Sequence, residues 1–245
     1  MEKNGFIHWS EPEILLYDED PAVRMSYPDF IEDRGKFFVT ETQKTVARVH
    51  EIDRTLLEGL WNQAENRTVA RQGMVAEFDG KGSTLSMPAL PELRTGGFSL
   101  DFWIKLRELS PGQTLFDARD PSGKGIAIST SNRFTLNLTL NDGATTAEWD
   151  SDPGTAPGTL KVGQWQHVAV VVDGGPKIIT WIVDGVLNDG GAIRDFGWGR
   201  FAPQLSNVSG AAEARIAPQV RRLRIYNRYL RTSEAVGNYH AGGSA

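Results

Sequence analysis

Residues 165–190 read WQHVAVVVDGGPKIITWIVDGVLNDG. Two runs in this stretch, HVAVVVD at 167–173 and KIITWIVD at 177–184, are rich in Val, Ile, Thr and Trp. Such residues favour strands, and a Gly-Gly-Pro turn separates the two runs. We therefore predict a pair of antiparallel strands, followed by a second turn at Asp184-Gly185.

Similar strand signals recur from Thr68 onward, and the loops between them are rich in Gly, Pro, Asp and Asn. About eleven short strands with regular turns are typical of an antiparallel two-sheet sandwich. In the run FTLNLTL, apolar and polar residues alternate, so the two sets face opposite sides of a sheet. We expect the core to hold Phe134, Leu136, Leu138 and Leu140, and the solvent side or a concave groove to hold Thr135, Asn137 and Thr139.

Three motifs connect this region with a known fold. The W-x-H-V-A hairpin at 165–169 is followed by a strand that ends in V-D-G, and two further motifs flank it, GGFSLDFWIKL at 96–106 and VRRLRIYNRYLRTSEAVGNYHAG at 220–242. Together they resemble the laminin-G-like, concanavalin-type jelly-roll domains over residues 68–242. The resemblance implies an all-β, antiparallel two-sheet jelly roll. It does not select one function, because the fold hosts lectins, carbohydrate-binding modules, adhesion domains and glycosidases.

The first 66 residues differ from the rest and form a separate predicted unit, which leaves 67–245 as the jelly-roll domain. EPEILLYDED at 11–20 and RGKFFVTETQKTVARVHEI at 34–52 predict three short strands with a hairpin turn near 33–36. RTLLEGLWNQ at 54–63 has apolar residues at helical spacing and predicts a short amphipathic helix. At the other end, SEAVGNYH at 233–240 predicts a closing helix with Ser233 as its N-cap.

The stretch SYPDFIEDRGKFFVTET at 26–42 resembles a motif in the last blades of sialidase-like β-propellers. The resemblance places Tyr27 where sialidases keep a nucleophilic tyrosine and Glu41 at the acidic end of the motif. Pro28 departs from the usual Ser, and this sequence holds no further blades to supply an arginine triad. We therefore expect the C-terminal region of a longer extracellular or periplasmic protein, without sialidase activity of its own. A homodimer through residues 1–62 would cover the surface where further blades would pack.

Composition excludes several classes of function. The net charge is −5, from 31 acidic and 26 basic side chains, which argues against nucleic acid as a partner. The absence of cysteine excludes disulfides and thiolate metal sites. No apolar run approaches the roughly 18 residues of a membrane span, and the N-terminus lacks the apolar stretch of a signal peptide. Either the protein is cytosolic or its export signal lies outside this sequence, and the jelly-roll resemblance favours the second alternative.

Calcium is the cofactor that the jelly-roll resemblance implies, because hard cations take several oxygen ligands. FDGKGS at 78–83 would supply Asp79 and the backbone of Gly80 and Ser83. The family's last strand usually adds an Asp, but Arg221 stands at that position here, and a guanidinium cannot ligate a cation. The alternative for Asp79 is an ordinary turn residue in an Asp-Gly step.

A sugar-binding surface needs an aromatic ring for stacking and polar groups that bind hydroxyls. The loop RDFGWGRFAPQ at 194–204 offers Trp198 as the stacking ring, with Asp195 and Arg200 beside it. Asn137 is a further candidate hydroxyl partner, and Trp149 is the second candidate ring. The alternative is that the rings of this loop close the open end of the sandwich. We expect the other strand-borne tryptophans, Trp103, Trp165 and Trp181, in the core, and His167 as a structural, hydrogen-bonded histidine.

Glycosidase chemistry needs two carboxylates about 5–5.5 Å apart for retention or about 6.5–9.5 Å apart for inversion. Glu148 and Asp150 have the required alternation, and Asp101 within FSLDFWI is the third weak candidate. The sequence therefore favours a non-catalytic carbohydrate-binding accessory domain of a glycoside-hydrolase-type protein. Two alternatives stay open, namely a glycoside hydrolase acting on β-glucans or related glycans, and a structural spacer that binds no ligand.

Overall fold

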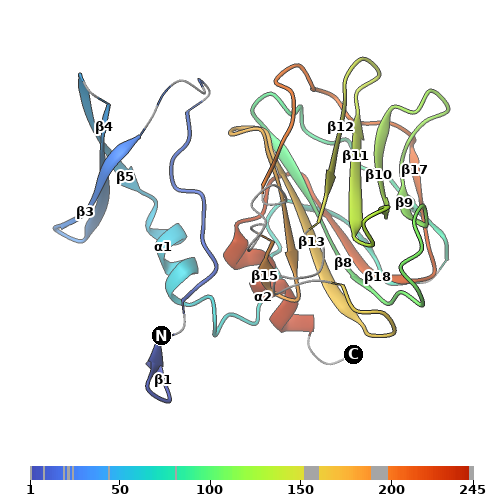
Figure 1. Cartoon of the computed structure of the whole chain (residues 1–245), viewed down its shortest axis with the longest axis horizontal. Helices are drawn as coiled ribbons and strands as arrows, with labels where there is room; N and C mark the ends of the chain where they lie inside the picture. Colours follow the sequence, from blue (N-terminus) through green and yellow to red (C-terminus); the bar gives the residue numbers. More distant parts are fainter. Residues whose placement is uncertain are drawn as a thin grey trace.

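The computed structural model describes residues 2–7, 9–18, 20, 23, 25–43, 45–80, 82–151, 160–188 and 198–242. An N-terminal part precedes a two-sheet sandwich (Figure 1). The elements of the N-terminal part are β1 (Glu2–Lys3), β2 (Phe6–Ile7), β3 (Ser26–Asp33), β4 (Lys36–Gln43), β5 (Val46–Ile52) and α1 (Arg54–Trp61).

The sandwich consists of a six-stranded sheet, in the order β12-β11-β10-β9-β17-β7, and a seven-stranded sheet, in the order β15-β14-β13-β8-β18-β6 with β16 beside β14. Neighbouring strands pair antiparallel, which confirms the predicted jelly roll. The strands are β6 (Met74–Phe78), β7 (Thr84–Ser86), β8 (Gly97–Ile104), β9 (Thr114–Asp117), β10 (Gly125–Thr130), β11 (Leu136–Asn141), β12 (Thr146–Asp150), β13 (Gln166–Asp173), β14 (Ile178–Val183), β15 (Val186–Leu187), β16 (Gly199–Arg200), β17 (Glu213–Ile216) and β18 (Val220–Tyr226).

The hairpin predicted from 165–190 is present as β13 and β14, with Val170 opposite Trp181. The second turn has positive φ angles at Asp184 (50°) and Gly185 (76°), as tight hairpin turns require. Trp181 and Trp103 are buried as expected. The prediction for Trp165 is wrong, because this residue precedes β13 and is only half-buried.

The core lies between the two sheets and confirms most of the predicted alternation. Leu136, Leu138 and Leu140 of β11 are completely buried there, together with alternate residues of β8, β13 and β18. Phe134 is the exception, with 59% of its surface exposed. It precedes the strand, in a turn where its φ angle is 62°, so the alternation does not extend to it. Thr135, expected toward solvent, is buried beneath this turn.

The outer face of the seven-stranded sheet is covered by the C-terminal helix α2 (Thr232–Gly242). Beneath the helix, the Asp101 carboxylate accepts hydrogen bonds from Arg224 (2.8 Å) and Asn238 (3.0 Å) and contacts Nε2 of His167 (2.8 Å). This network confirms His167 as a structural histidine. It also joins β8, β13 and β18 to α2 through polar contacts.

The helix α2 begins one residue earlier than predicted, so Ser233 is not its N-cap. Instead, the carboxylate of Glu13 accepts hydrogen bonds from the N–H groups of Thr232 (2.9 Å) and Ser233 (2.8 Å). The side chain of Glu234 accepts a further bond from Arg231 N–H. Free N–H groups at a helix start attract carboxylates, and here a distant segment supplies one.

The N-terminal part contains a three-stranded sheet, β3-β4-β5, with the predicted turn between Asp33 and Lys36. The helix α1 packs on one face of this sheet, through Leu57 against Phe37, Val39 and Ile52. Asp53 caps α1 by accepting a hydrogen bond from Thr55 N–H. Residues 9–18, hereafter the strap, form no strand, although 11–20 was predicted to contain one. Figure 1 shows α1, α2 and the strap between the three-stranded sheet and the sandwich.

Candidate functional site

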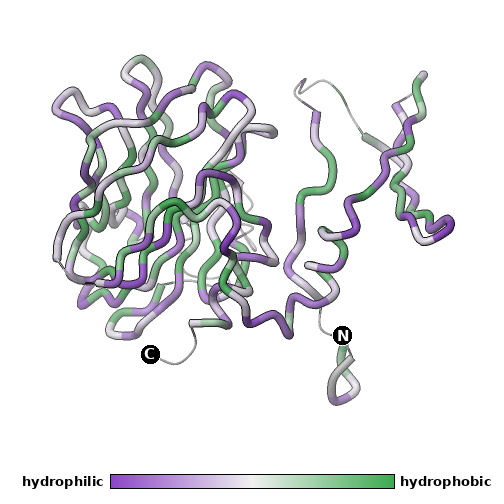
Figure 2. Tube along the Cα trace, turned by 180° about the vertical axis from the view of Figure 1, so that it is seen from behind, coloured by the Kyte–Doolittle hydropathy of each residue, from purple (hydrophilic) through white to green (hydrophobic). Residues whose placement is uncertain are grey.

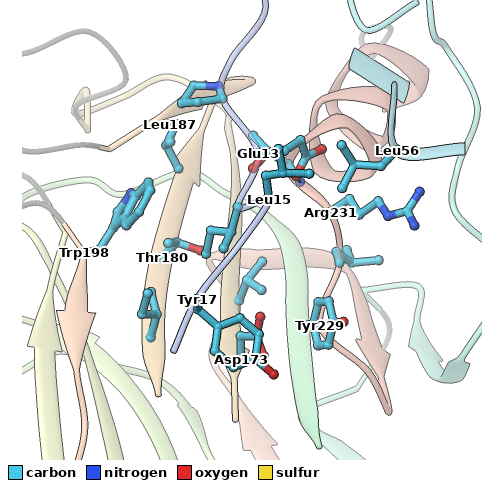
Figure 3. A pocket seen from close by; sticks show the side chains of 16 residues that line it. Glu13, Leu15, Tyr17, Leu56, Asp173, Thr180, Leu187, Trp198, Tyr229 and Arg231 are labelled. Atoms are coloured by element: carbon cyan, nitrogen blue, oxygen red, sulfur yellow. Dashed lines mark hydrogen bonds between the residues drawn. The ribbon is translucent and has the colours of Figure 1, made fainter. Parts of the chain in front are cut away.

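A cavity of about 220 Å³ lies between the strap and the outer face of β13 and β14. The strap passes so close to the β13–β14 turn that a Cβ atom added at Gly175 would lie 2.5 Å from the Tyr17 hydroxyl. Glu11 fixes the strap at the sheet edge by accepting a hydrogen bond from Leu187 N–H. The strap therefore forms one wall of the cavity, and the sheet forms its floor (Figure 3).

The aromatic wall of the cavity is Trp198, whose side chain is 41% exposed. It directly precedes β16, which pairs with β14 through Gly199 and Ile179. A Cβ atom added at Gly199 would lie 2.4 Å from the ring of Trp149, so the inner side of β16 is filled. Side chains alternate along a strand, and Trp198 is therefore directed to the outer side, toward the cavity. Tyr17 and Tyr229 line the cavity as well.

Asp173 and Thr180 supply polar groups from the floor of the cavity. Burial raises the pKa of the Asp173 carboxyl, and the hydrogen bond from Gly175 N–H and the charge of Lys177 offset this only in part. A carboxylate that has lost part of its hydration is stabilised when a ligand hydroxyl donates a hydrogen bond to it. The charged groups on the helix side are already engaged, since Glu13 caps α2 and Arg231 binds Asp53 (2.5 Å).

The structure separates the sugar-binding residues that the sequence suggested. Arg200 is exposed on β16, next to the strand position of Trp198, whereas Asp195 lies outside the described residues. Asn137 is on the outer face of the six-stranded sheet, where it donates to Asp150 (2.8 Å). Trp149 packs at the edge of the core against Gly199, so it presents no free ring face on the Asn137 side. Trp198 and Asn137 therefore lie on opposite faces of the sandwich.

The three candidate catalytic carboxylates also lie apart. Glu148 and Asp150 share the outer face of the six-stranded sheet, because they alternate along β12. Glu148 is exposed, while Asp150 contacts Asn137 and lies 3.8 Å from Arg133. Asp101 is completely buried beneath α2 and bonded on both oxygens. No substrate reaches a carboxylate in that position, which removes Asp101 as a catalytic candidate.

The structure places Asp79, the predicted calcium ligand, beside a cationic side chain. Asp79 is exposed in the turn after β6, and a Cβ atom added at Gly80 would lie 3.3 Å from Cγ of Arg221. The cationic side chain therefore runs beside the turn, where a ligand carboxylate would be needed. Within the described part of the chain, no three His, Asp or Glu side chains are grouped so that they could hold a metal.

The two residues of the sialidase-like motif occupy the three-stranded sheet. Tyr27 lies in the bulge of the edge strand β3 and is 85% exposed. Glu41 is buried on β4, where Arg48 binds its carboxylate at 2.9 Å. The two side chains thus sit in very different surroundings, and neither lines the cavity beside Trp198.

The sequence profile of the Concanavalin A-like lectin/glucanases superfamily matches residues 79–236. The chain belongs to this superfamily. The matched segment of this concanavalin A-like chain includes every strand of the two sheets except β6, and it excludes the strap. No match was found among curated protein sequences. Of the described helices, neither is long and apolar enough to cross a membrane.

Several solved structures are similar to parts of this chain at low sequence identity. Trypanosoma rangeli sialidase, in complex with 2,3-difluorosialic acid, is 12% identical with a TM-score of 0.45, covering 90% of this chain and 45% of that chain. The binding domain of botulinum neurotoxin serotype D is 12% identical with a TM-score of 0.48, covering 68% and 42%. This concanavalin A-like chain thus spans less than half the length of these proteins.

Of the residues that line the cavity, the sequence singled out Trp198 but not Asp173, Thr180 or Tyr17. Asp173 carries a visible signal, because it follows the apolar run at 168–172, and Thr180 is a polar residue in an apolar run. Tyr17 carries none, because only the folded path of the strap brings it to the β13–β14 turn.

Proposed function

We propose that this chain is a carbohydrate-binding module and that the cavity beside Trp198 is its binding site. One observation carries the proposal: an exposed indole ring and a desolvated carboxylate line the same small cavity. Sugars present an apolar ring face together with hydroxyl groups, and this pair of side chains complements both. Membership of a superfamily of lectins and glucanases supports the same reading.

The size of the cavity limits the ligand. At about 220 Å³ it is smaller than the roughly 300–1,000 Å³ of sites for drug-sized molecules. One sugar ring fits this volume, and residues of the strap line the cavity and narrow it. The proposed ligand is therefore a terminal or branching sugar rather than the interior of a polysaccharide. Asp173 and Thr180 would bind its hydroxyls while Trp198 stacks on the ring.

The test begins with a glycan array probed with the intact chain, followed by calorimetric titration of the best glycan. Replacing Trp198 by Ala is expected to weaken binding at least about tenfold, a loss of about 1.4 kcal/mol. The matched control is Trp9→Ala, because Trp9 is also exposed but lies outside the cavity. Unchanged affinity in the Trp198 variant would refute the site, and equal losses in both variants would indicate a non-specific effect.

A glycoside hydrolase site is the second candidate. Residues two apart on a strand are separated by roughly 6.6 Å, which lies in the range for inverting carboxylate pairs. Glu148 and Asp150 have this spacing on the six-stranded sheet. Mass spectrometry of glycans incubated with the chain would detect cleavage. Cleavage by the parent chain that is lost in each of the variants Glu148→Gln and Asp150→Asn would favour hydrolysis over binding alone.

A self-association surface is the third candidate, and it develops the spacer hypothesis. Apolar side chains are exposed on both outer strands of the three-stranded sheet, including Tyr27 and Phe30 on β3 and Val49 on β5. Figure 2 shows apolar residues on this sheet, which stands away from the sandwich. Both outer strands leave one edge of the backbone unpaired within the sheet, so β3 of one copy would pair with β5 of another.

A further inference from the structure

A second groove, of about 520 Å³, lies at the end of the seven-stranded sheet where β8 finishes. Lys105, Arg107, Trp165, Pro218 and Gln219 line it. It shares no lining residue with the cavity beside Trp198, so the two are separate sites.

Backbone contacts fix the walls of this groove. β8 pairs with β13 and with β18 as far as Ile104, so Lys105 leaves the sheet between Trp165 and Gln219. The N–H of Lys105 donates to the carbonyl of Gln219 at 3.1 Å. The N–H of Gly163 donates to Leu106 at 2.8 Å, which ties the segment before Trp165 to the end of β8. The groove is therefore shaped by the sheet rather than by a free loop.

The groove is cationic in an acidic protein. Lys105 and Arg107 line it, and the guanidinium of Arg221 lies 4.6 Å from the ring centroid of Trp165. In the described part of the chain, none of these three cations forms an ion pair with a carboxylate, and no carboxylate lines the groove. The whole chain has a net charge of −5, so this local positive charge is not a general property of its surface.

Trp165 also restrains the position of Arg221. A guanidinium over an indole face is held by the attraction between the cation and the ring, which reduces the freedom that the side chain would lose on binding. Arginine in such a position presents several N–H donors to a carboxylate or sulfate. An aromatic wall beside fixed cations suits a ligand that has both an apolar ring face and a negative charge.

We propose that this groove binds a negatively charged saccharide, with the carboxylate or sulfate of the sugar held by Lys105, Arg107 and Arg221. The site goes beyond the binding of a sugar at Trp198 and does not depend on it. A long nucleic acid is a poorer candidate, because the excess of acidic groups elsewhere would repel its phosphates. Exposed cations of this kind act over a short screened range, so binding should weaken as salt is added.

The experiment is calorimetric titration of the intact chain with trigalacturonic acid, a sulfated galactose trisaccharide and neutral galactotriose, at low and at high salt. The acidic probes are expected to bind, the neutral one to bind much more weakly, and high salt to reduce the acidic binding. The first two arms distinguish carboxylate from sulfate as the recognised group. Equal affinity for acidic and neutral probes, or no binding of either acidic probe, would overturn the proposal.

Variants connect the binding to the groove. Lys105→Gln with Arg107→Gln should lower the affinity for the acidic probes about tenfold or more, and Arg221→Gln should lower it independently. The control, Arg34→Gln with Lys36→Gln, removes the same charge from the exposed β3–β4 hairpin and should have no effect. Equal losses of affinity in the groove variants and the control variant would show that only the net charge matters, and would refute the assignment of the groove. Trp198→Ala should leave acidic binding intact, which separates this site from the first one.

Discussion

The carboxylate of Glu13 lies 2.8 Å from the backbone nitrogen of Ser233, a residue 220 positions further along the chain. The same carboxylate accepts a hydrogen bond from the Ser233 hydroxyl. The strap is thus bonded to the start of the helix that covers the seven-stranded sheet. One acidic side chain therefore stabilises the C-terminal helix and holds the wall of the proposed sugar site.

Removal of this cap should destabilise the whole chain. We expect Glu13→Ala to lower the free energy of unfolding by about 0.5–2 kcal/mol, because two N–H groups at the start of α2 lose their acceptor. Urea denaturation measures the change. Glu32→Ala is the control, since Glu32 lies exposed on β3. Equal urea midpoints for the parent and the Glu13 variant would show that water satisfies the N–H groups as well as the carboxylate does, so that the cap adds no stability.

Two tryptophans close to one another in sequence should respond very differently to truncation. Trp181 is 1% exposed in the core, so Trp181→Ala should cost about 3–5 kcal/mol of stability. Trp198→Ala should change the melting temperature little while removing glycan binding. Thermal melts of both variants, followed by titration, provide the comparison. A large loss of stability in the Trp198 variant would assign its ring to structure rather than to binding.

Acid should weaken the contact between α2 and the sheet. Burial alone would raise the pKa of the Asp101 carboxyl, but His167, Arg224 and Asn238 together hold the pKa below its usual range. The stability that Asp101 contributes is therefore complete above the unfolded carboxyl pKa of about 3.9 and is lost as the pH falls below it. Urea midpoints measured between about pH 6 and pH 3 should show this loss, and Asp101→Asn should flatten it.

The same Asp101→Asn variant should be less stable at neutral pH by about 3–5 kcal/mol, because the buried Arg224 loses its buried counter-charge and keeps only the half-exposed Glu77, 3.5 Å away. Asp150→Asn, on the partly exposed face of β12, is the matched control, with an expected change of about 1 kcal/mol or less. Similar losses in both variants would contradict a special role for the buried network.

The contribution of Asp173 to stability should change with pH in the opposite direction to that of Asp101. Burial raises the pKa of this carboxyl, so keeping it ionised costs stability once the pH rises above its unfolded pKa. We expect Asp173→Asn to be at least as stable as the parent at neutral pH and to bind the sugar about tenfold more weakly. Denaturation and titration of one preparation test both statements. A destabilised variant with unchanged affinity would place Asp173 outside the site.

The three-stranded sheet should drive self-association. Val49 is 66% exposed on the edge strand β5. Val49→Lys places a charge on this edge, which leaves the fold intact but opposes pairing with a strand of a second copy. Analytical ultracentrifugation should show association that increases with concentration in the parent and is lost in the variant. A parent that sediments as a monomer at all concentrations would end this candidate.

The strands could be predicted because their signals are local. In β13 and β14, β-branched residues and a Gly-Gly-Pro turn determine pairing within one short stretch. Errors occurred at the ends of elements, where Phe134 and Trp165 continue an apolar pattern beyond the last ladder pair. Residues 11–18 form no strand, and the side chains of Glu11 and Glu13 there bond to two separate elements instead.

The site was predictable only in part, because its walls come from segments far apart in sequence. Trp198 could be found from its loop, in which aromatic rings alternate with glycine. Trp149 looked similar in sequence, yet it fills the space above Gly199, a contact that no local pattern reveals. Asn137 was predicted on the correct face of its own strand. Its distance from Trp198 could not be predicted, because β11 and β16 belong to different sheets and the sequence does not show which strands join which sheet.

Strand β18 lies between β6 and β8 in the seven-stranded sheet. During synthesis, β6 emerges from the ribosome long before β18 exists, since Phe78 and Leu223 are paired but separated by most of the domain. At about 5–20 residues per second, β6 would wait on the order of ten seconds or more for its neighbour. The edge of the seven-stranded sheet therefore cannot be completed during synthesis until β18 has emerged, so folding of this sheet has to wait for the C-terminal end of the domain.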